Sequence, residues 1–169
     1  MSPSQKSGLV LAVHPTSRGF GWVLFEGPLA PVNWGIASVK TNRSAWCMMR
    51  FGKLLDLYRP KAILLEVNDP PEEARRGRVA FLVQDMQGFA ANRDIDIHVY
   101  SRIEIATALL SDEDASRGAV VKVVADLLPI LRDRLPSPRR PWQSIDGRRC
   151  LFDAAALGIT HYRVTRRDL

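Results

Sequence analysis

The chain has 169 residues, of which 46% are hydrophobic and 25% are charged, a composition typical of one ordinary globular domain with a hydrophobic core. It has no apolar run of membrane-spanning length, and its start (MSPSQKS) lacks the apolar core of a signal peptide, which argues against a membrane or secreted protein. Two cysteines, Cys47 and Cys150, are too few for a disulfide framework, so we expect a reducing, cytoplasmic location.

The charge balance is more informative. The formal net charge is +6 and the isoelectric point is about 9.8. The excess is mostly arginine, and it is clustered at positions 75, 76 and 78, at 139 and 140, at 148 and 149, and at 163, 166 and 167. Guanidinium groups match phosphate geometry, which favours a nucleic-acid partner. Scattered arginines also keep a protein soluble, so composition alone leaves both interpretations open.

Residues 1–7 are polar and are expected to be a loose terminus, followed by one domain over residues 8–165. The apolar run Leu9–Val13 is rich in β-branched residues and predicts a strand buried on both faces, with His14 at its end. Glycines at positions 19 and 21 permit a tight reversal into a second strand over Trp22–Phe25. A third strand is predicted over Val32–Val39, so three antiparallel strands open the chain.

The middle of the chain alternates helices and strands. Ser44 is a candidate N-cap for a helix that Pro60 ends, and Ala62–Val67 is a buried-type strand that carries Glu66 near its end. A charged loop then leads into a helix predicted over Val79–Asn92. Residues 95–100 alternate apolar and polar side chains, which predicts a half-buried or edge strand.

Helices dominate the last third of the chain. A short helix is predicted over Arg102–Leu110, and an acidic stretch suits the start of a second helix over Ala115–Leu131. A proline-rich connector precedes the last helix, predicted over Asp146–Tyr162. His161 then falls near a helix end and is expected to interact with the helix dipole, whereas His98 is expected on the surface.

This order of elements predicts an α/β domain with a mixed five-stranded sheet flanked by helices. The first strand is expected at the centre, with the fourth strand beside and parallel to it through a crossover helix. His14 and Glu66 then end adjacent parallel strands and are expected to face one site.

Three stretches carry a resemblance to a known family. They are residues 10–22 (VLAVHPTSRGFGW), residues 59–66 (RPKAILLE) and residues 153–161 (DAAALGITH). In this order and spacing they resemble the RuvC family of Holliday-junction resolvases, over nearly the whole chain. The resemblance implies the ribonuclease H-like fold and metal-dependent cleavage of four-way DNA junctions.

The resemblance also implies a metal site for two divalent ions, usually Mg²⁺ or Mn²⁺. Glu66 stands where the family has its strand-four Glu, and Asp153 where it has its final Asp. His14 replaces the Asp of the first strand, and Cys150 stands where the family has Asp or His. An imidazole offers one lone pair in place of two anionic oxygens, so Mg²⁺ affinity is expected to fall.

Three hypotheses follow for this substituted site. The protein is still a nuclease, which uses Mn²⁺ or a single metal, with His14 as a candidate general base. Alternatively, catalysis is lost and the protein binds DNA as a non-cutting or scaffold protein. In the third, His14, Glu66, Cys150 and Asp153 hold Zn²⁺, although their spacing matches no zinc motif.

Basic and aromatic residues near these positions are candidates for DNA contact. Phe81 follows the arginine-rich loop and has two interpretations, a wedge against bases or a core residue. The candidate DNA-binding residues are Arg75, Arg76, Arg78, Phe81, Arg117, Arg148 and Arg149.

From the sequence we therefore predict a metal-dependent endonuclease of the Holliday-junction resolvase type, acting on branched DNA as a homodimer and without a membrane. A catalytically inactive DNA-binding or scaffold protein is the main alternative. A nuclease of the same superfamily that acts on other DNA is the third.

Overall fold

One mixed sheet of five strands forms the middle of the molecule. The structure is a computed structural model, and it describes residues 8–16, 18–38, 43–67, 77–110, 117–136 and 148–167. The sheet order is β3-β2-β1-β4-β5, with β1 to β3 antiparallel and with β4 and β5 parallel to β1. The predicted α/β sheet with a central first strand is confirmed. The strands are β1 (Val10–Thr16), β2 (Gly19–Gly27), β3 (Ala30–Ser38), β4 (Ala62–Val67) and β5 (Asp96–Ser101).

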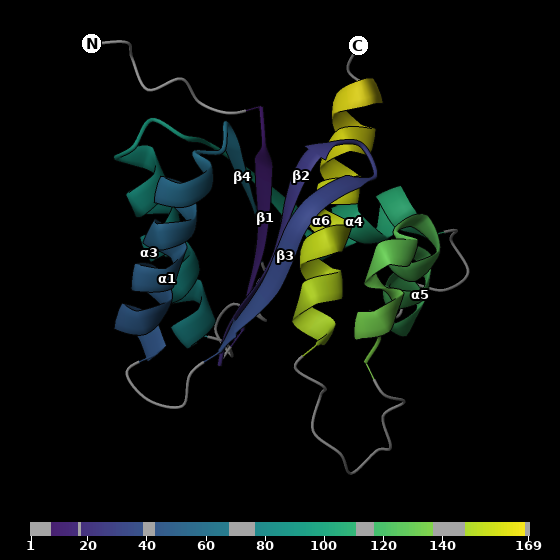
Figure 1. Cartoon of the computed structure of the whole chain (residues 1–169), viewed down its shortest axis with the longest axis horizontal. Coiled ribbons are helices and arrows are strands. Elements are labelled where there is room, and N and C mark those ends of the chain that lie inside the picture. Colours follow the sequence, from purple (N-terminus) through teal and green to yellow (C-terminus); the bar gives the residue numbers. More distant parts are fainter. Residues whose placement is uncertain are drawn as a thin grey trace.

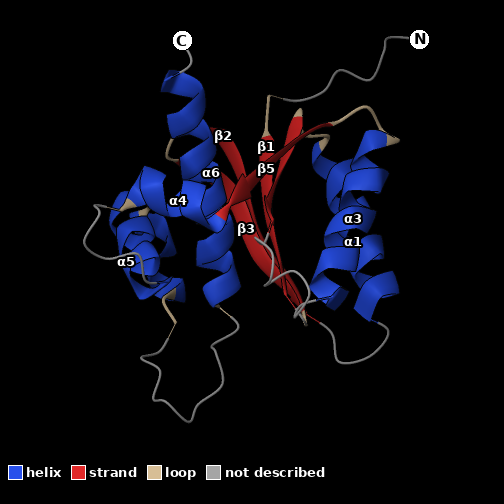
Figure 2. Cartoon of the chain, turned by 180° about the vertical axis from the view of Figure 1, so that it is seen from behind, coloured by secondary structure: helices blue, strands red, loops and turns tan. Residues whose placement is uncertain are grey.

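Helices cover both faces of this sheet (Figures 1 and 2). The pair α1 and α3 lies on one face, and α4, α5 and α6 lie on the other. A short 3₁₀ helix, η1, follows α5. The bounds are α1 (Arg43–Tyr58), α3 (Gly77–Ala91), α4 (Arg102–Leu109), α5 (Arg117–Leu127), η1 (Pro129–Arg134) and α6 (Arg149–Arg167).

The two-residue period of β1 explains why the sheet has two buried faces. Leu11 and Val13 pack into the core beneath α1 and α3, whereas Val10 and Ala12 pack into the core beneath α6. All four side chains are fully buried. A strand that contacts helices on both sides has no solvent face, which is why it reads as a continuous apolar run.

Two helix boundaries differ from the predicted ones by more than two residues. The helix predicted to reach Leu131 ends at Leu127, because Pro129 disfavours helical backbone at Leu128 and continues the chain as η1. The last helix runs five residues past the predicted Tyr162, to Arg167. Its predicted start at Asp146, like residues 1–7, lies outside the described residues.

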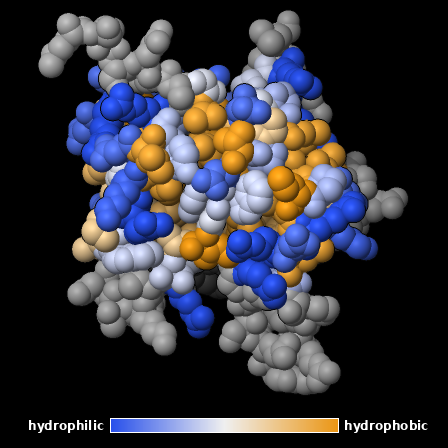
Figure 3. Space-filling view, in the orientation of Figure 1, coloured by the Kyte–Doolittle hydropathy of each residue, from blue (hydrophilic) through white to orange (hydrophobic). Residues whose placement is uncertain are grey.

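The surface shows the usual mixture of side chains. On the face that carries β3, apolar residues are interspersed with hydrophilic ones (Figure 3). Cys47 and Cys150 are both buried, in α1 and α6 on opposite sides of the sheet, and neither forms a disulfide. In the described part of the chain, no helix combines the length and the apolar character needed to span a membrane.

Candidate active site

The register of β1 and β4 brings His14 and Glu66 side by side. Val13 pairs with Leu65 in the parallel ladder, so the next residue on each strand is His14 and Glu66. Both follow the alternation that directs Ala12 and Leu64 toward α6. The two side chains therefore face the same helix, and each residue is 7% exposed.

The first turns of α6 supply the third polar side chain. Asp153 is also 7% exposed, and it is followed by three buried alanines at positions 154–156. Alanine side chains allow a helix axis to approach a sheet closely, and α6 packs on β1, β2 and β4. A carboxylate at the start of this small-residue face is thereby held against the ends of the strands.

Gly21 is the residue that permits this approach. It is paired with His14 in the antiparallel ladder of β1 and β2. A Cβ atom at Gly21 would lie 2.4 Å from the carbonyl oxygen of Cys150, in the first turn of α6. Because the opposing atom belongs to the main chain, any side chain at position 21 would push α6, and Asp153 with it, away from the sheet.

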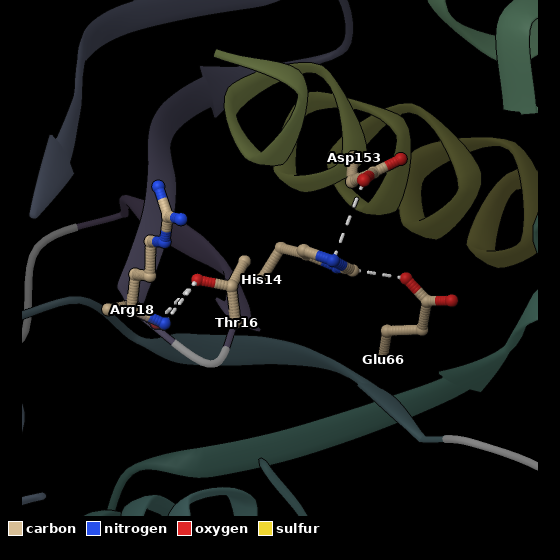
Figure 4. Close-up of polar contacts among 6 residues, drawn as sticks. His14, Thr16, Arg18, Glu66 and Asp153 are labelled. Atoms are coloured by element: carbon tan, nitrogen blue, oxygen red, sulfur yellow. Dashed lines mark hydrogen bonds and ion pairs between the residues drawn. The ribbon is translucent and has the colours of Figure 1, made fainter. Parts of the chain in front are cut away.

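The imidazole of His14 stands between the two carboxylates (Figure 4). Its Nδ1 atom lies 2.9 Å from Oε2 of Glu66, and its Nε2 atom lies 3.5 Å from Oδ2 of Asp153. One ring thus joins β1, β4 and α6 through their side chains. Buried carboxylates are stable only with partners of opposite charge or with hydrogen-bond donors, and a protonated His14 would be such a partner for both.

A narrow cavity opens beside Glu66 and Asp153. Its other lining residues are Arg102, Ile105, Ala106, Val120 and Ala156. Among the described residues of this lining Arg102 is the only basic one, and sequence reasoning did not single it out. Its signal is indirect, because Arg102 comes two residues after Tyr100, the residue paired with Glu66 on β5.

The other predicted site residues have mixed outcomes. Cys150 is buried one turn before Asp153 and contacts Gly21 through its carbonyl. Arg148 and Arg149 are half-buried where α6 begins, in the turn before Asp153. Phe81 is 69% exposed in α3, so the core interpretation of this residue is wrong.

Several predicted DNA contacts cannot be located by their side chains. Arg75 and Arg76 lie outside the described residues, as do the side chains of Arg78 in α3 and Arg117 in α5. Arg163, from the last arginine cluster, donates a 2.7 Å hydrogen bond to the carbonyl of Ala108 at the end of α4. That arginine therefore has a structural contact.

The donors of this cluster differ from those that the metals implied by the resemblance need. Within the described ranges, no group of three or more His, Cys, Asp and Glu residues is arranged to hold a metal ion. Two hard cations beside a phosphate need several carboxylates, whereas this cluster offers those of Glu66 and Asp153 around one imidazole. By donor type this cluster would suit one ion that accepts nitrogen as well as oxygen, such as Mn²⁺, better than two Mg²⁺ ions, but its three side chains contact one another and are not arranged around an ion.

A second polar cluster lies about two turns further along α6. The Nδ1 atom of His161 is 2.7 Å from the hydroxyl of Tyr100, and its ring centroid is 4.8 Å from that of exposed His98. Burial lowers the pKa of His161 to about 4, with further lowering by His98 and Lys61. The predicted interaction with the helix end is wrong, because the helix continues to Arg167 and His161 is buried.

The whole chain resembles solved resolvase structures. RuvC of T. thermophilus in complex with a Holliday junction substrate is 18% identical, with a TM-score of 0.71 over 95% of this chain and 96% of that one. The yeast mitochondrial Holliday junction resolvase is 15% identical, with a TM-score of 0.60 over 99% and 83% of the two chains. The Fowlpox virus resolvase, solved with Holliday junction DNA, is 11% identical, with a TM-score of 0.55 over 93% and 98%.

The sequence itself matches no protein-family model and no curated protein. Identities this low carry the fold and not the chemistry. This chain has the RuvC-like, ribonuclease H-like fold, with His14, Glu66 and Asp153 gathered at the ends of its central parallel strands.

Proposed function

We propose that this chain binds branched DNA of the four-way junction type and cleaves it as a metal-dependent endonuclease. The observation that carries the proposal is the meeting of Glu66 and Asp153 around His14, on a fold shared at full length with Holliday junction resolvases. Residues from β1, β4 and α6 are far apart in the sequence and form one buried polar cluster. The net charge of +6 favours a polyanionic partner.

Glu66, Asp153 and His14 are the residues that would hold a divalent ion. The bound ion would supply charge stabilisation at the phosphate and activate a water molecule. The chain's own contribution is positional. Nδ1 of His14 faces Glu66, which leaves Nε2, on the side of Asp153, as the ring atom that would bind the ion.

The phosphodiester backbone is expected to approach along the basic and aromatic residues around this cluster. Arg148 and Arg149 lie at the start of the helix that carries Asp153. Phe81 presents an exposed ring in the helix that follows β4, and an exposed aromatic ring can stack on an unpaired base. We include Arg75, Arg76, Arg78 and Arg117 in the proposed DNA surface from their sequence positions.

We also propose that two copies act together. A four-way junction has approximate two-fold symmetry, and a two-fold dimer presents two equivalent sites to opposite strands. Sedimentation of the protein with a synthetic junction is expected to give a complex of two chains per junction. A complex with a single chain would refute the dimer.

A second function is favoured by the two contacts that His14 makes with the carboxylates. The His14 ring lies within 2.9 Å of Glu66 and 3.5 Å of Asp153, so the cluster is already closed by its own side chains. A protein with this arrangement binds a junction and protects it without cutting. The two functions share the DNA surface and differ only in strand cleavage.

One assay separates them. A labelled synthetic four-way junction and a linear duplex of equal length are incubated with the protein in Mg²⁺ or in Mn²⁺, and binding and nicking are measured. We expect selective binding of the junction and nicking that is stronger in Mn²⁺. Junction binding without nicks in either metal would establish the second function, and equal affinity for duplex would refute both.

Substitutions identify the residues responsible. Glu66→Gln and Asp153→Asn are expected to abolish nicking and to retain junction binding, whereas Glu26→Gln, an exposed carboxylate near the far end of β2, is expected to retain both. His14→Asp restores the residue that the family has on the first strand and is expected to raise nicking in Mg²⁺. Unchanged nicking in Mg²⁺ would argue against the role given to position 14.

The exposed aromatic ring is tested separately. Phe81→Ala is expected to weaken junction binding by about tenfold, because stacking of one base is worth roughly 1–3 kcal/mol. Leu57→Ala is the control, since Leu57 is a similarly exposed apolar residue in α1, at 71% against 69% for Phe81. Equal effects of the two substitutions would remove Phe81 from the DNA surface.

A further inference from the structure

The cavity beside the carboxylates is lined by one arginine, Arg102, whose position at a helix start does not stabilise the helix. Arg102 is the first residue of α4, where the helix dipole is positive and a basic side chain is unfavourable. Acidic residues are the ones that stabilise this end, and α4 has Glu104 for that purpose. We therefore expect the arginine at position 102 to serve the cavity that it lines.

The backbone holds Arg102 in a defined place. Ser101 ends β5 and caps α4, and its hydroxyl accepts a 3.2 Å hydrogen bond from the main chain of Glu104. The carboxylate of Glu104 in return accepts a 2.7 Å bond from the main chain of Ser101. This capping box fixes the transition from strand to helix on both sides of Arg102.

The sheet register then places this transition beside the candidate active site. Glu66 pairs with Tyr100, and Val67 pairs with Ser101, in the parallel ladder of β4 and β5. Arg102 is the next residue, and it lines the same cavity as Glu66 and Asp153. It is half-buried, and its neighbour Ile103 is 69% exposed, so the start of α4 lies at the protein surface.

A phosphodiester that approaches this cavity meets two carboxylates, which repel it. His14 contacts both of those carboxylates within the cluster. Arg102 lies on the cavity wall, and its planar fork can donate two hydrogen bonds to one phosphate group. A side-chain cation there can hold an anion against the wall of the cavity without a metal ion.

We propose that Arg102 is a phosphate-binding residue of this site, which contacts the DNA backbone at the junction crossover. The inference deepens the proposed function, because it names the residue that brings the backbone to Glu66 and Asp153. The contact between Arg102 and the phosphate needs no bound metal and does not require the strand to be cut. It can therefore hold whether the protein cleaves junctions or only binds them.

The test is a cycle that pairs a protein change with a phosphate change. Wild type, Arg102→Ala, Arg102→Lys and Arg166→Ala are titrated in EDTA against junctions with a single neutral methylphosphonate linkage, scanned across the crossover. Arg166 is the matched control, since it is an exposed arginine on α6 and lies 13 residues from Asp153, about 20 Å along the helix. Dissociation constants are measured by fluorescence anisotropy, and thermal melting reports the fold of each variant.

We expect Arg102→Ala to weaken binding of the unmodified junction about tenfold and to lower the salt slope by about one. One neutral linkage should weaken wild type by a similar factor and leave Arg102→Ala unaffected, because the interaction is already absent. Arg102→Lys should keep part of the affinity, since it preserves charge and loses the fork. Arg166→Ala should remain as sensitive to every linkage as wild type.

Two outcomes would overturn the inference. If Arg102→Ala binds the junction normally, or loses affinity equally at every linkage, Arg102 does not contact a crossover phosphate and the proposed function stands without it. A lower melting temperature with an unchanged linkage profile would show that Arg102 only balances the charge of Glu66 and Asp153. Failure of the wild type to bind any junction would instead refute the proposed function, and this contact with it.

Discussion

Removal of the His14 imidazole should make the stability of this protein depend on metal ions. The side chains of Glu66 and Asp153 are 5% and 8% exposed, and the ring lies within 2.9 and 3.5 Å of them. In His14→Ala both buried carboxylates lose this partner at once. Their mutual repulsion then opposes the packing of α6 on β1 and β4.

The expected magnitude follows from the burial of the cluster. Loss of one partner from a buried ion pair costs about 3–5 kcal/mol, and we take about 3 kcal/mol because the cluster borders an open cavity. For a chain of this length, each kcal/mol lowers the melting temperature by about 2–4 °C, so the expected decrease is about 6–12 °C. A divalent ion at 100 times its dissociation constant returns about 2.7 kcal/mol, which is most of the loss.

The assay is thermal and urea unfolding in EDTA and in millimolar Mg²⁺ or Mn²⁺. Val10→Ala serves as the control, because Val10 is fully buried on the same face of β1 and its truncation costs about 2 kcal/mol without changing the carboxylates. His14→Ala is expected to be restored by metal, and Val10→Ala is not. A normal stability of His14→Ala in EDTA, or equal rescue of both variants, would refute the reasoning.

Two further predictions concern residues that support the site. Gly21→Ala should destabilise the fold by about 1–3 kcal/mol and disrupt junction cleavage, because its Cβ atom would lie 2.4 Å from the Cys150 carbonyl oxygen. Gly27→Ala is the control and should change unfolding and activity little, because its Cβ atom would have no atom within 4 Å. Equal effects of the two substitutions would contradict the packing argument. The pKa of His161 is lowered from 6.5 to about 4 in the folded state. Its contribution to the free energy of unfolding, about 3 kcal/mol in total, is therefore present above pH 6.5 and is lost as the pH falls toward 4. Urea unfolding between pH 7.5 and 4 should show this loss in wild type and not in His161→Asn, and a loss of the same size in the variant would assign it to other groups.

Local sequence patterns were sufficient for most of the architecture. The apolar runs at Leu9–Val13 and Ala62–Val67 are continuous because their strands are covered on both faces, so they could be recognised without tertiary information. The end of α1 could also be predicted from the local sequence. Arg59 has a left-handed φ of 46°, its main-chain nitrogen bonds the Leu55 carbonyl at 2.9 Å, and Pro60 follows. The error at Leu131 arose where helical periodicity outweighed Pro129, which is also a local signal.

The sequence by itself also determined which residues could form a site. His14 ends the first strand and Glu66 comes near the end of the fourth, so their convergence followed from a parallel pairing of those strands. Asp153 was placed beside them only by the resemblance of the last helix to the RuvC family. The tertiary structure alone decided that the imidazole lies between the two carboxylates, that Gly21 admits α6, and that Arg102 lines the same cavity. These facts depend on the distance between elements that are remote in the chain. Such distances are set by side-chain packing across the sheet and leave no periodic trace in the sequence.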